Sequence, residues 1–230
     1  MSLYVLGDPH LSLGSQKPMD IFAGWDGYVS LLEENWKKTV QPDDIILLAG
    51  DISWALKLEE TKADFDFLEG LPGRKILLKG NHDLWWSTKS KVERFWAEQG
   101  YTSFSLLFNN AYEYGDYCLC GSRGWINEPG VPQDKKILDR EAGRLRMSLQ
   151  AGKATGKTPI VFLHYPPVYA SLRCDEIMEV LLEYGVKRCY YGHLHGKDTF
   201  RGAVNGVREG IEFTLISADY LRFQPKLVEM

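Results

Sequence analysis

The sequence predicts an α/β fold in which mixed β-sheets form a sandwich. Short apolar runs, typical of buried strands, alternate with longer amphipathic segments over most of the 230 residues. Residues 103–122 interrupt this alternation with short β-prone runs, and the chain from Thr199 onward is again rich in β-forming residues. Strands alternating with helices and followed by hairpins are typical of a sandwich of mixed sheets. Without a linker or repeat, a single domain is expected over residues 1–230.

The predicted elements follow from periodicity and from turn residues. Asn109-Asn110 and Gly115-Asp116 are hairpin signals between short strands, and Asn205-Gly206 is expected to form a tight turn in a closing meander. Apolar runs predict strands at 4–6, 45–49, 75–79, 159–163 and 187–191. Amphipathic patterns predict helices at 28–40, 54–71, 89–99, 135–149 and 174–184.

Composition restricts the class of protein and its location. The net charge is −4 and no basic block occurs, which argues against nucleic-acid binding as the main role. A nucleotide substrate stays compatible, because bound metal ions would supply local positive charge. The chain begins directly with a strand-like run, and no apolar stretch approaches the length of a membrane span. We therefore expect a cytoplasmic protein that does not contact a membrane.

The four cysteines are predicted to be reduced thiols. Cys118 and Cys120 alternate along a probable strand and share one of its faces, whereas Cys174 and Cys189 lie far apart in the sequence. No Cys-x-x-Cys spacing occurs, so a structural zinc site is not expected.

All five histidines of the chain lie just past an apolar run that is predicted to be a strand. A single histidine in such a place is more often a surface or hydrogen-bonded residue than a metal ligand. In open α/β sheets, however, binding sites collect at the carboxyl ends of strands. Two aspartates and an asparagine occupy equivalent places, so the set as a whole indicates a metal site. Its members are His10, His82, His164, His193 and His195 with Asp8, Asp51 and Asn81.

Five short motifs in a fixed order carry a resemblance to a known family. The motifs are Asp8-Pro9-His10, Gly50-Asp51, Gly80-Asn81-His82-Asp83, the lone His164, and Gly192-His193-Leu194-His195. Each motif alone is weak, but in this order they resemble the calcineurin-like metallophosphoesterase superfamily. The resemblance extends from Asp8 to His195. It implies a two-metal hydrolase of phosphate esters with a four-layer α-β-β-α sandwich, in which two mixed β-sheets pack face to face between flanking helices.

The donor set fits two metal ions. Two carboxylates, one amide and four imidazoles are too many donors for one tetrahedral zinc but suit two first-row ions with a shared carboxylate and water. Manganese, iron and zinc all accept such donors. The resemblance implies that Asp51 bridges the ions and that a hydroxide held between them attacks the phosphate in line. It assigns Asp8, His10, Asp51 and His195 to one ion, and Asp51, Asn81, His164 and His193 to the other.

His82 lies beside a predicted ligand without being one. The resemblance implies that it contacts the substrate phosphate or protonates the leaving oxygen, so that His82 joins Asp51 as a catalytic residue; a histidine that only fixes the loop is the alternative. In the protein-phosphatase branch, the residue three places after the bridging aspartate is a carboxylate that orients this histidine. Here Trp54 occupies that position. We expect Asp83 to brace the loop.

Three further features have more than one interpretation each. Arg123, in a glycine-flanked turn, either contacts substrate phosphate or makes a structural hydrogen bond. Trp85 and Trp86 either stack a base, form an apolar wall or pack in the core. The loop of residues 11–26 is either a rim or lid of the site or an uninvolved surface loop.

The sequence thus predicts a dinuclear phosphohydrolase that acts on a small phosphomonoester or phosphodiester. A nuclease is one alternative, although repair nucleases of this superfamily usually carry added DNA-binding segments. A non-catalytic scaffold, such as the retromer subunit with this fold, is the other. Scaffolds of that kind lose metal ligands, and this chain has all of them. The oligomeric state is left open.

Overall fold

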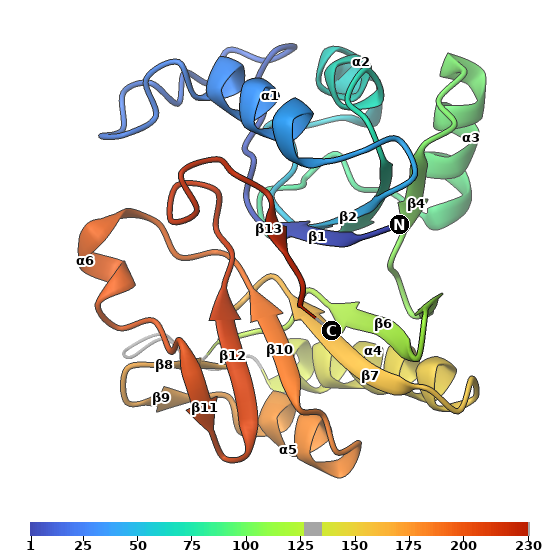
Figure 1. Cartoon of the computed structure of the whole chain (residues 1–230), viewed down its shortest axis with the longest axis vertical. Coiled ribbons are helices and arrows are strands. Elements are labelled where there is room, and N and C mark those ends of the chain that lie inside the picture. The colour runs from blue at the N-terminus through green and yellow to red at the C-terminus, as the bar shows by residue number, and fades with distance from the viewer. Residues whose placement is uncertain (127–134, 230) are drawn as a thin grey trace. The chain divides into compact units, whose positions relative to one another are not determined.

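The computed structural model describes residues 1–126 and 135–229, and the chain forms two compact units (Figure 1). The first unit comprises Met1–Leu106 and Ile216–Met230, and the second comprises Leu107–Leu215. Each unit is built on its own mixed β-sheet and carries helices. The predicted α/β class, with two mixed sheets and flanking helices, is therefore confirmed.

The sheet of the first unit has the strand order β13-β1-β2-β3-β4. Strands β1 to β4 run parallel to one another, and β13 is antiparallel to β1. Strand β2 is apolar and buried at every position, as expected for a parallel strand that is covered on both faces. The strands are β1 (Leu3–Leu6), β2 (Ile45–Ala49), β3 (Arg74–Leu78), β4 (Phe104–Leu106) and β13 (Lys226–Leu227).

The helices of the first unit are α1 (Tyr28–Thr39), the 3₁₀ helix η1 (Leu58–Thr61), α2 (Lys62–Glu69) and α3 (Lys89–Gln99). The helix predicted over 54–71 is wrong at its start, because residues 54–57 are not helical. There the backbone N–H of Trp54 donates to the Leu11 carbonyl, and the Glu60 carboxylate accepts the N–H groups of Leu56 and Lys57. These bonds give the segment partners outside a helix, which begins only at Leu58.

The second unit contains a sheet of order β11-β12-β10-β7-β6-β5 and a separate two-stranded ribbon. Strands β6, β7, β10 and β12 are parallel, and hairpins add the two edges. The strands are β5 (Tyr112–Tyr114), β6 (Tyr117–Ser122), β7 (Thr158–Leu163), β8 (Val168–Tyr169), β9 (Leu172–Arg173), β10 (Arg188–Tyr191), β11 (Gly206–Arg208) and β12 (Ile211–Leu215). The helices are α4 (Lys135–Lys153), α5 (Asp175–Glu183) and α6 (Gly196–Phe200).

The strand pairing shows that two of the three predicted turns are wrong. Gly115-Asp116 does join a hairpin, β5–β6. Asn109-Asn110 does not, because the strands on either side of it belong to different sheets. The hairpin β11–β12 turns at Glu209-Gly210, both with positive φ (53° and 78°), the geometry that a two-residue hairpin turn requires. The Asn205 side chain instead accepts the N–H of Leu215.

Helix α4 continues four residues beyond its predicted end and packs closely against β6 there. A Cβ at Gly152 would lie 2.8 Å from the Cys118 sulfur and 2.5 Å from the Cys120 sulfur, so glycine lets the helix cover the strand. The two sulfurs share one face of β6, 3.9 Å apart, and all four cysteines are free, as predicted. None of the helices in residues 1–126 and 135–229 combines the length and apolar character needed to span a membrane.

Candidate functional site

The polar residues of the first unit follow three neighbouring parallel strands. Strand β1 leads to Asp8 and His10, β2 to Asp51, and β3 to Asn81 and His82. Because the carboxyl ends of parallel neighbours share one edge of a sheet, these side chains come together. His10 Nε2 lies 3.7 Å from Asp51 Oδ2, and Asp8 and His10 offer ligand atoms within 4.8 Å of one another. The ring centres of His10 and His82 are 5.8 Å apart.

The backbone at these residues is strained. Asp8, His10 and Asp51 have φ values of 57°, 45° and 51°, in the left-handed region that non-glycine residues rarely adopt. Such a conformation costs of order 1–3 kcal/mol per residue and clusters at functional sites. Two hydrogen bonds hold the loops in it, from Asp8 N–H to the Gly50 carbonyl (3.0 Å) and from His10 N–H to the Asp51 carbonyl (2.9 Å). The sequence gives no sign of this strain.

Gly80 is required by its contact with Asp51. A Cβ built at Gly80 would lie 2.1 Å from Asp51 Oδ1 and 2.2 Å from the Asp51 backbone nitrogen. The glycine therefore lets the loop after β3 pass directly against Asp51. Two residues later, the His82 N–H donates to Asp51 Oδ1 at 2.7 Å. The loop after β3 thus fixes Asp51 through protein contacts alone.

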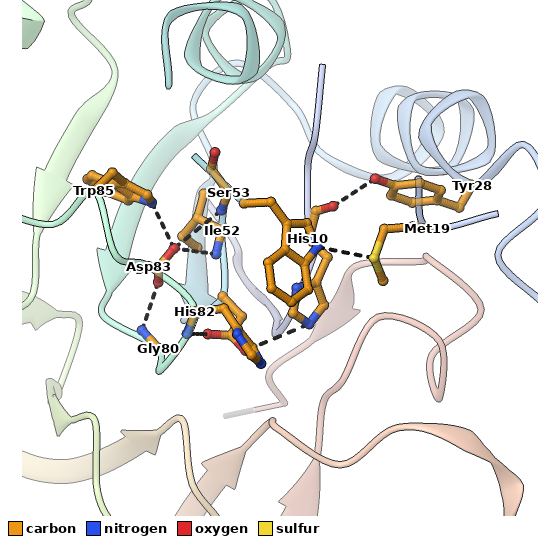
Figure 2. Close-up of polar contacts among 11 residues, drawn as sticks. His10, Met19, Tyr28, Ile52, Ser53, Gly80, His82, Asp83 and Trp85 are labelled. Carbon is orange, nitrogen blue, oxygen red and sulfur yellow. Dashed lines mark hydrogen bonds and ion pairs between the residues drawn. The ribbon is translucent and has the colours of Figure 1, made fainter. Parts of the chain in front are cut away.

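The Asp83 carboxylate joins the two loops, as Figure 2 shows. One oxygen accepts the N–H groups of Ile52 (2.8 Å) and Ser53 (3.2 Å) and the indole N–H of Trp85 (3.0 Å). The other accepts the N–H of Gly80 at 2.7 Å. The expectation that Asp83 braces the loop is confirmed. Trp85 is 2% exposed, which agrees with its core-packing interpretation.

The electrostatics of this unit favour a bound cation. Asp8, Asp51 and Asp83 are all buried carboxylates. Burial, followed by the charge of Asp51, raises the pKa of Asp83 above its usual range. A buried cluster of negative charge is costly unless cations neutralise it. Hard oxygen donors beside imidazole nitrogens suit a divalent ion, so the residues present fit the metals that the resemblance implies.

Trp54 packs against both histidines of the first unit. Its ring is stacked on His10, with centroids 4.9 Å apart and an interplanar angle of 19°, and lies 4.3 Å from the His82 ring at 45°. The indole N–H donates to the Met19 sulfur at 3.1 Å. Trp54 therefore connects the two histidines to the loop of residues 11–26, and Met19 appears beside them in Figure 2.

Trp25, near the end of the loop of residues 11–26, and Tyr28, just beyond it, both contact His10. The Tyr28 hydroxyl, just beyond the loop, donates to the His10 carbonyl at 2.7 Å (Figure 2). The Trp25 ring meets the His10 ring edge-on at 5.8 Å. These contacts favour the rim interpretation over that of an uninvolved surface loop. The sequence does not reveal the partners, because Trp25 and Tyr28 reach His10 from a different part of the chain.

The second unit provides the other histidines from two parallel neighbours. Strand β7 ends before His164, and β10 leads to His193 and His195. The rings of His164 and His193 form a T-shaped pair, with 5.1 Å between centroids and 75° between planes, and offer ligand atoms within 4.8 Å of one another. His193 also has a positive φ, 73°. His195 is the N-cap residue of α6.

Arg123 and Tyr165 hold these histidines in place. The Arg123 carbonyl accepts the N–H groups of His164 (3.2 Å) and Tyr165 (2.9 Å), and the Tyr165 ring lies 4.2 Å from that of His193. The Arg123 guanidinium donates to the buried Glu141 at 3.0 Å. These contacts agree with the structural interpretation of Arg123, and its substrate contact stays a prediction. Sequence reasoning missed Tyr165 and Glu141, which have no distinguishing pattern.

Comparison with known proteins gives one family and a shared fold. A model of the calcineurin-like phosphoesterase family matches residues 1–197. A structure of a protein of unknown function from Aquifex aeolicus is similar at 16% identity and TM-score 0.53, covering 98% of this chain and 95% of that chain. A phosphopantetheinyl hydrolase from Mycobacterium tuberculosis is similar at 14% identity and TM-score 0.54, covering 99% and 95%. At these identities the likeness shows the fold alone. No curated protein matched the sequence.

Proposed function

The chain belongs to the calcineurin-like phosphoesterase family and is a metal-dependent hydrolase of phosphoric esters, and on this premise we propose that it hydrolyses a small phosphomonoester or phosphodiester with the help of two divalent ions. The family match supports the proposal, because the matched residues 1–197 contain all seven predicted donors. We propose that these donors act together and that residues 1–230 form a single functional domain.

The two ions would share Asp51. Asp8, His10, Asp51 and His195 would hold one ion, and Asp51, Asn81, His164 and His193 would hold the other. Bound divalent ions of this kind polarise phosphoryl oxygens and make water a competent nucleophile near neutral pH. Manganese, iron and zinc all remain suitable for this nitrogen and oxygen donor set. The close packing of Gly80 and the His82 N–H against Asp51 supports the bridging role, because a shared carboxylate must be held in one orientation.

We propose that His82 binds the substrate phosphate and gives a proton to the leaving oxygen. Its backbone is tied to Asp51, and its ring packs against Trp54 rather than against an orienting carboxylate at that position. The Trp54 ring offers no carboxylate oxygen that could accept the imidazole N–H and orient it for proton transfer. The phosphate contact should therefore contribute more to catalysis than proton donation does. Arg123 is a second, weaker candidate for phosphate contact.

The test is a panel of phosphomonoesters and phosphodiesters, with manganese returned to metal-stripped protein. We expect hydrolysis to depend on added manganese and to be lost in Asp51→Asn, with two ions per wild-type chain by elemental analysis. Single-stranded and double-stranded oligonucleotides in the same panel test the nuclease alternative. A protein that holds two ions and hydrolyses none of these esters would instead support the non-catalytic scaffold.

A further inference from the structure

The Lys17 ammonium lies next to Trp54, the aromatic residue that packs on the two histidines of the first unit. Lys17 Nζ is 4.4 Å from the centroid of the Trp54 ring, and the His82 ring centre is 4.3 Å from the same centroid. The ammonium therefore lies no farther from the His82 ring centre than the sum of these two distances. The proposed function does not use this positive charge.

The chain that follows Lys17 is anchored. Pro18 follows directly and restricts the Lys17 backbone to extended conformations. Met19, one residue further on, is 6% exposed and accepts the Trp54 indole N–H. At the far end of the loop, Trp25 packs edge-on against His10. Lys17 is thus presented from a fixed segment.

The Lys17 ammonium has hydrogen-bonding capacity to offer a ligand. Lys17 is the only basic residue in 11–26, and it is exposed. None of the ion pairs within the described residues involves it. A ring face attracts an ammonium through its quadrupole and is not a conventional acceptor. The three N–H donors of the lysine can therefore still turn toward an anion. Asp20 and Asp26, the acidic residues of the same loop, are exposed.

We propose that Lys17, with Trp54 as its platform, is a specificity-determining residue that binds a second anionic group of the substrate. This inference rests on the proposed function, in which His82 contacts the phosphate that is hydrolysed. The second group is a phosphate or a carboxylate, because both supply charged oxygen acceptors to an ammonium. The preferred substrates are then phosphate esters that carry a further anion close to the ester.

Three non-hydrolysable probes test the proposal. Methylphosphonate carries one anionic group, methylenediphosphonate adds a second phosphonate, and phosphonoacetate adds a carboxylate. Titration calorimetry would measure their binding to the manganese-loaded protein and to three variants, Lys17→Ala, Lys17→Arg and Lys91→Ala. Lys91 is an exposed lysine on α3, so its removal matches the change in net charge outside the loop. Circular dichroism checks that each variant is folded.

We expect Lys17→Ala to weaken at least one two-anion probe about tenfold while changing methylphosphonate less than about twofold, because the lost bond joins two charged groups. The probe that responds identifies the second group as phosphate or carboxylate. Lys17→Arg should restore binding, and Lys91→Ala should leave all three probes unchanged.

Equal changes for all three probes, or an equal loss in Lys91→Ala, would overturn the proposal, because either result means a general effect of charge. Absence of any wild-type preference for two-anion probes would overturn it as well. Ester hydrolysis by the wild type shows whether this inference alone has failed or the proposed function has failed with it. If esters are hydrolysed and Lys17→Ala binds the probes normally, only this inference fails; if no ester is hydrolysed, the proposed function fails with it.

Discussion

The proposed ligands of the first unit differ from those of the second unit in backbone conformation. Asp8, His10 and Asp51 all have left-handed φ values, and loop-to-loop hydrogen bonds keep them there. Among the proposed ligands of the second unit, all of which the structure describes, His193 alone shares this conformation. There the aromatic ring of Tyr165 contacts the rings of both His164 and His193.

This difference predicts where each unit is sensitive to mutation. In the first unit the Asp83 carboxylate and the contact of Gly80 with Asp51 leave no room for a changed loop. In the second unit the rings are set by contacts that another aromatic side chain could partly replace. Substitutions that disturb the backbone should therefore be most damaging in the first unit.

The largest effect is expected for Gly80→Ala. The new Cβ would collide with Asp51, so either the loop after β3 or Asp51 must move. We expect a loss of about 1–3 kcal/mol in the free energy of unfolding, which is typical of forced overpacking. Bound manganese and ester hydrolysis should fall together, because the residue that moves is the proposed shared ligand. Urea unfolding and elemental analysis measure the two effects.

Gly70→Ala is the matched control in the same unit. Gly70 ends α2 with a right-handed φ of −68°, and a Cβ there would have its nearest neighbours at 3.5 Å and 3.6 Å, which is ordinary contact. Its unfolding free energy should change by less than about 0.5 kcal/mol. If Gly80→Ala behaved like this control, the close approach to Asp51 would not constrain the site.

A second, smaller effect separates the two proposed ions by metal content. His10→Ala and His164→Ala should each weaken chiefly one ion, because the proposed ligand sets place these residues on different metals. Elemental analysis at limiting manganese would show about one ion per chain in each variant. His82→Ala is the control, since a non-ligand should leave both ions bound. Equal loss of both ions in both variants would mean that the partition is wrong, or that the site assembles only as a whole.

The sequence predicted those parts of the molecule that depend on local pattern. Strand β2 and helix α3 have the bounds that their apolar periodicity indicated, 45–49 and 89–99. The polar residues after the strands could be foreseen as well, because parallel neighbours deliver their carboxyl ends to one edge. Within each unit the structure brings such residues together, for example His164 with His193.

Features that depend on distant contacts could not be predicted. Trp54 begins an apparent helical pattern, but its N–H pairs with the carbonyl of Leu11, which lies in the segment after β1. The asparagine pair at 109–110 resembles a hairpin turn, and only the pairing of β4 with β3 shows that it is not one. Gly80 was recognised as part of a motif, but the 2.1 Å approach to Asp51 that requires it is visible only in three dimensions.

The smallest predicted effect concerns the buried charges of the two cores. In the second unit, the buried Glu141 has arginine partners, Arg123 at 3.0 Å and Arg144 at 2.8 Å. In the first unit, Lys75 on β3 is 1% exposed, and its ammonium donates to the Leu71 carbonyl and, at 3.2 Å, to the Ser103 hydroxyl. Burial lowers the pKa of Lys75 to about 8, partly offset by the charge of Glu69.

The sign of the resulting pH dependence follows from proton binding. Lysine in an unfolded chain has a pKa of about 10.4. From about pH 8 to that value, the unfolded chain binds more protons at Lys75 than the native protein does, so this residue makes stability rise with pH. Below about pH 8 both states are protonated and its contribution is constant.

Lys75→Met should remove this dependence. The variant should be more stable than the wild type at pH 7.5. By pH 10 this gain should shrink by an amount on the order of 1 kcal/mol, because Lys75 loses its proton at a lower pH in the folded state than in the unfolded state. Urea unfolding at the two pH values measures the difference, and Lys91→Met provides an exposed lysine as control. A difference between Lys75→Met and wild type that is the same at both pH values would mean that Lys75 keeps an ordinary pKa in the core. The first unit would then stabilise its buried charge as well as the second unit does with its arginines.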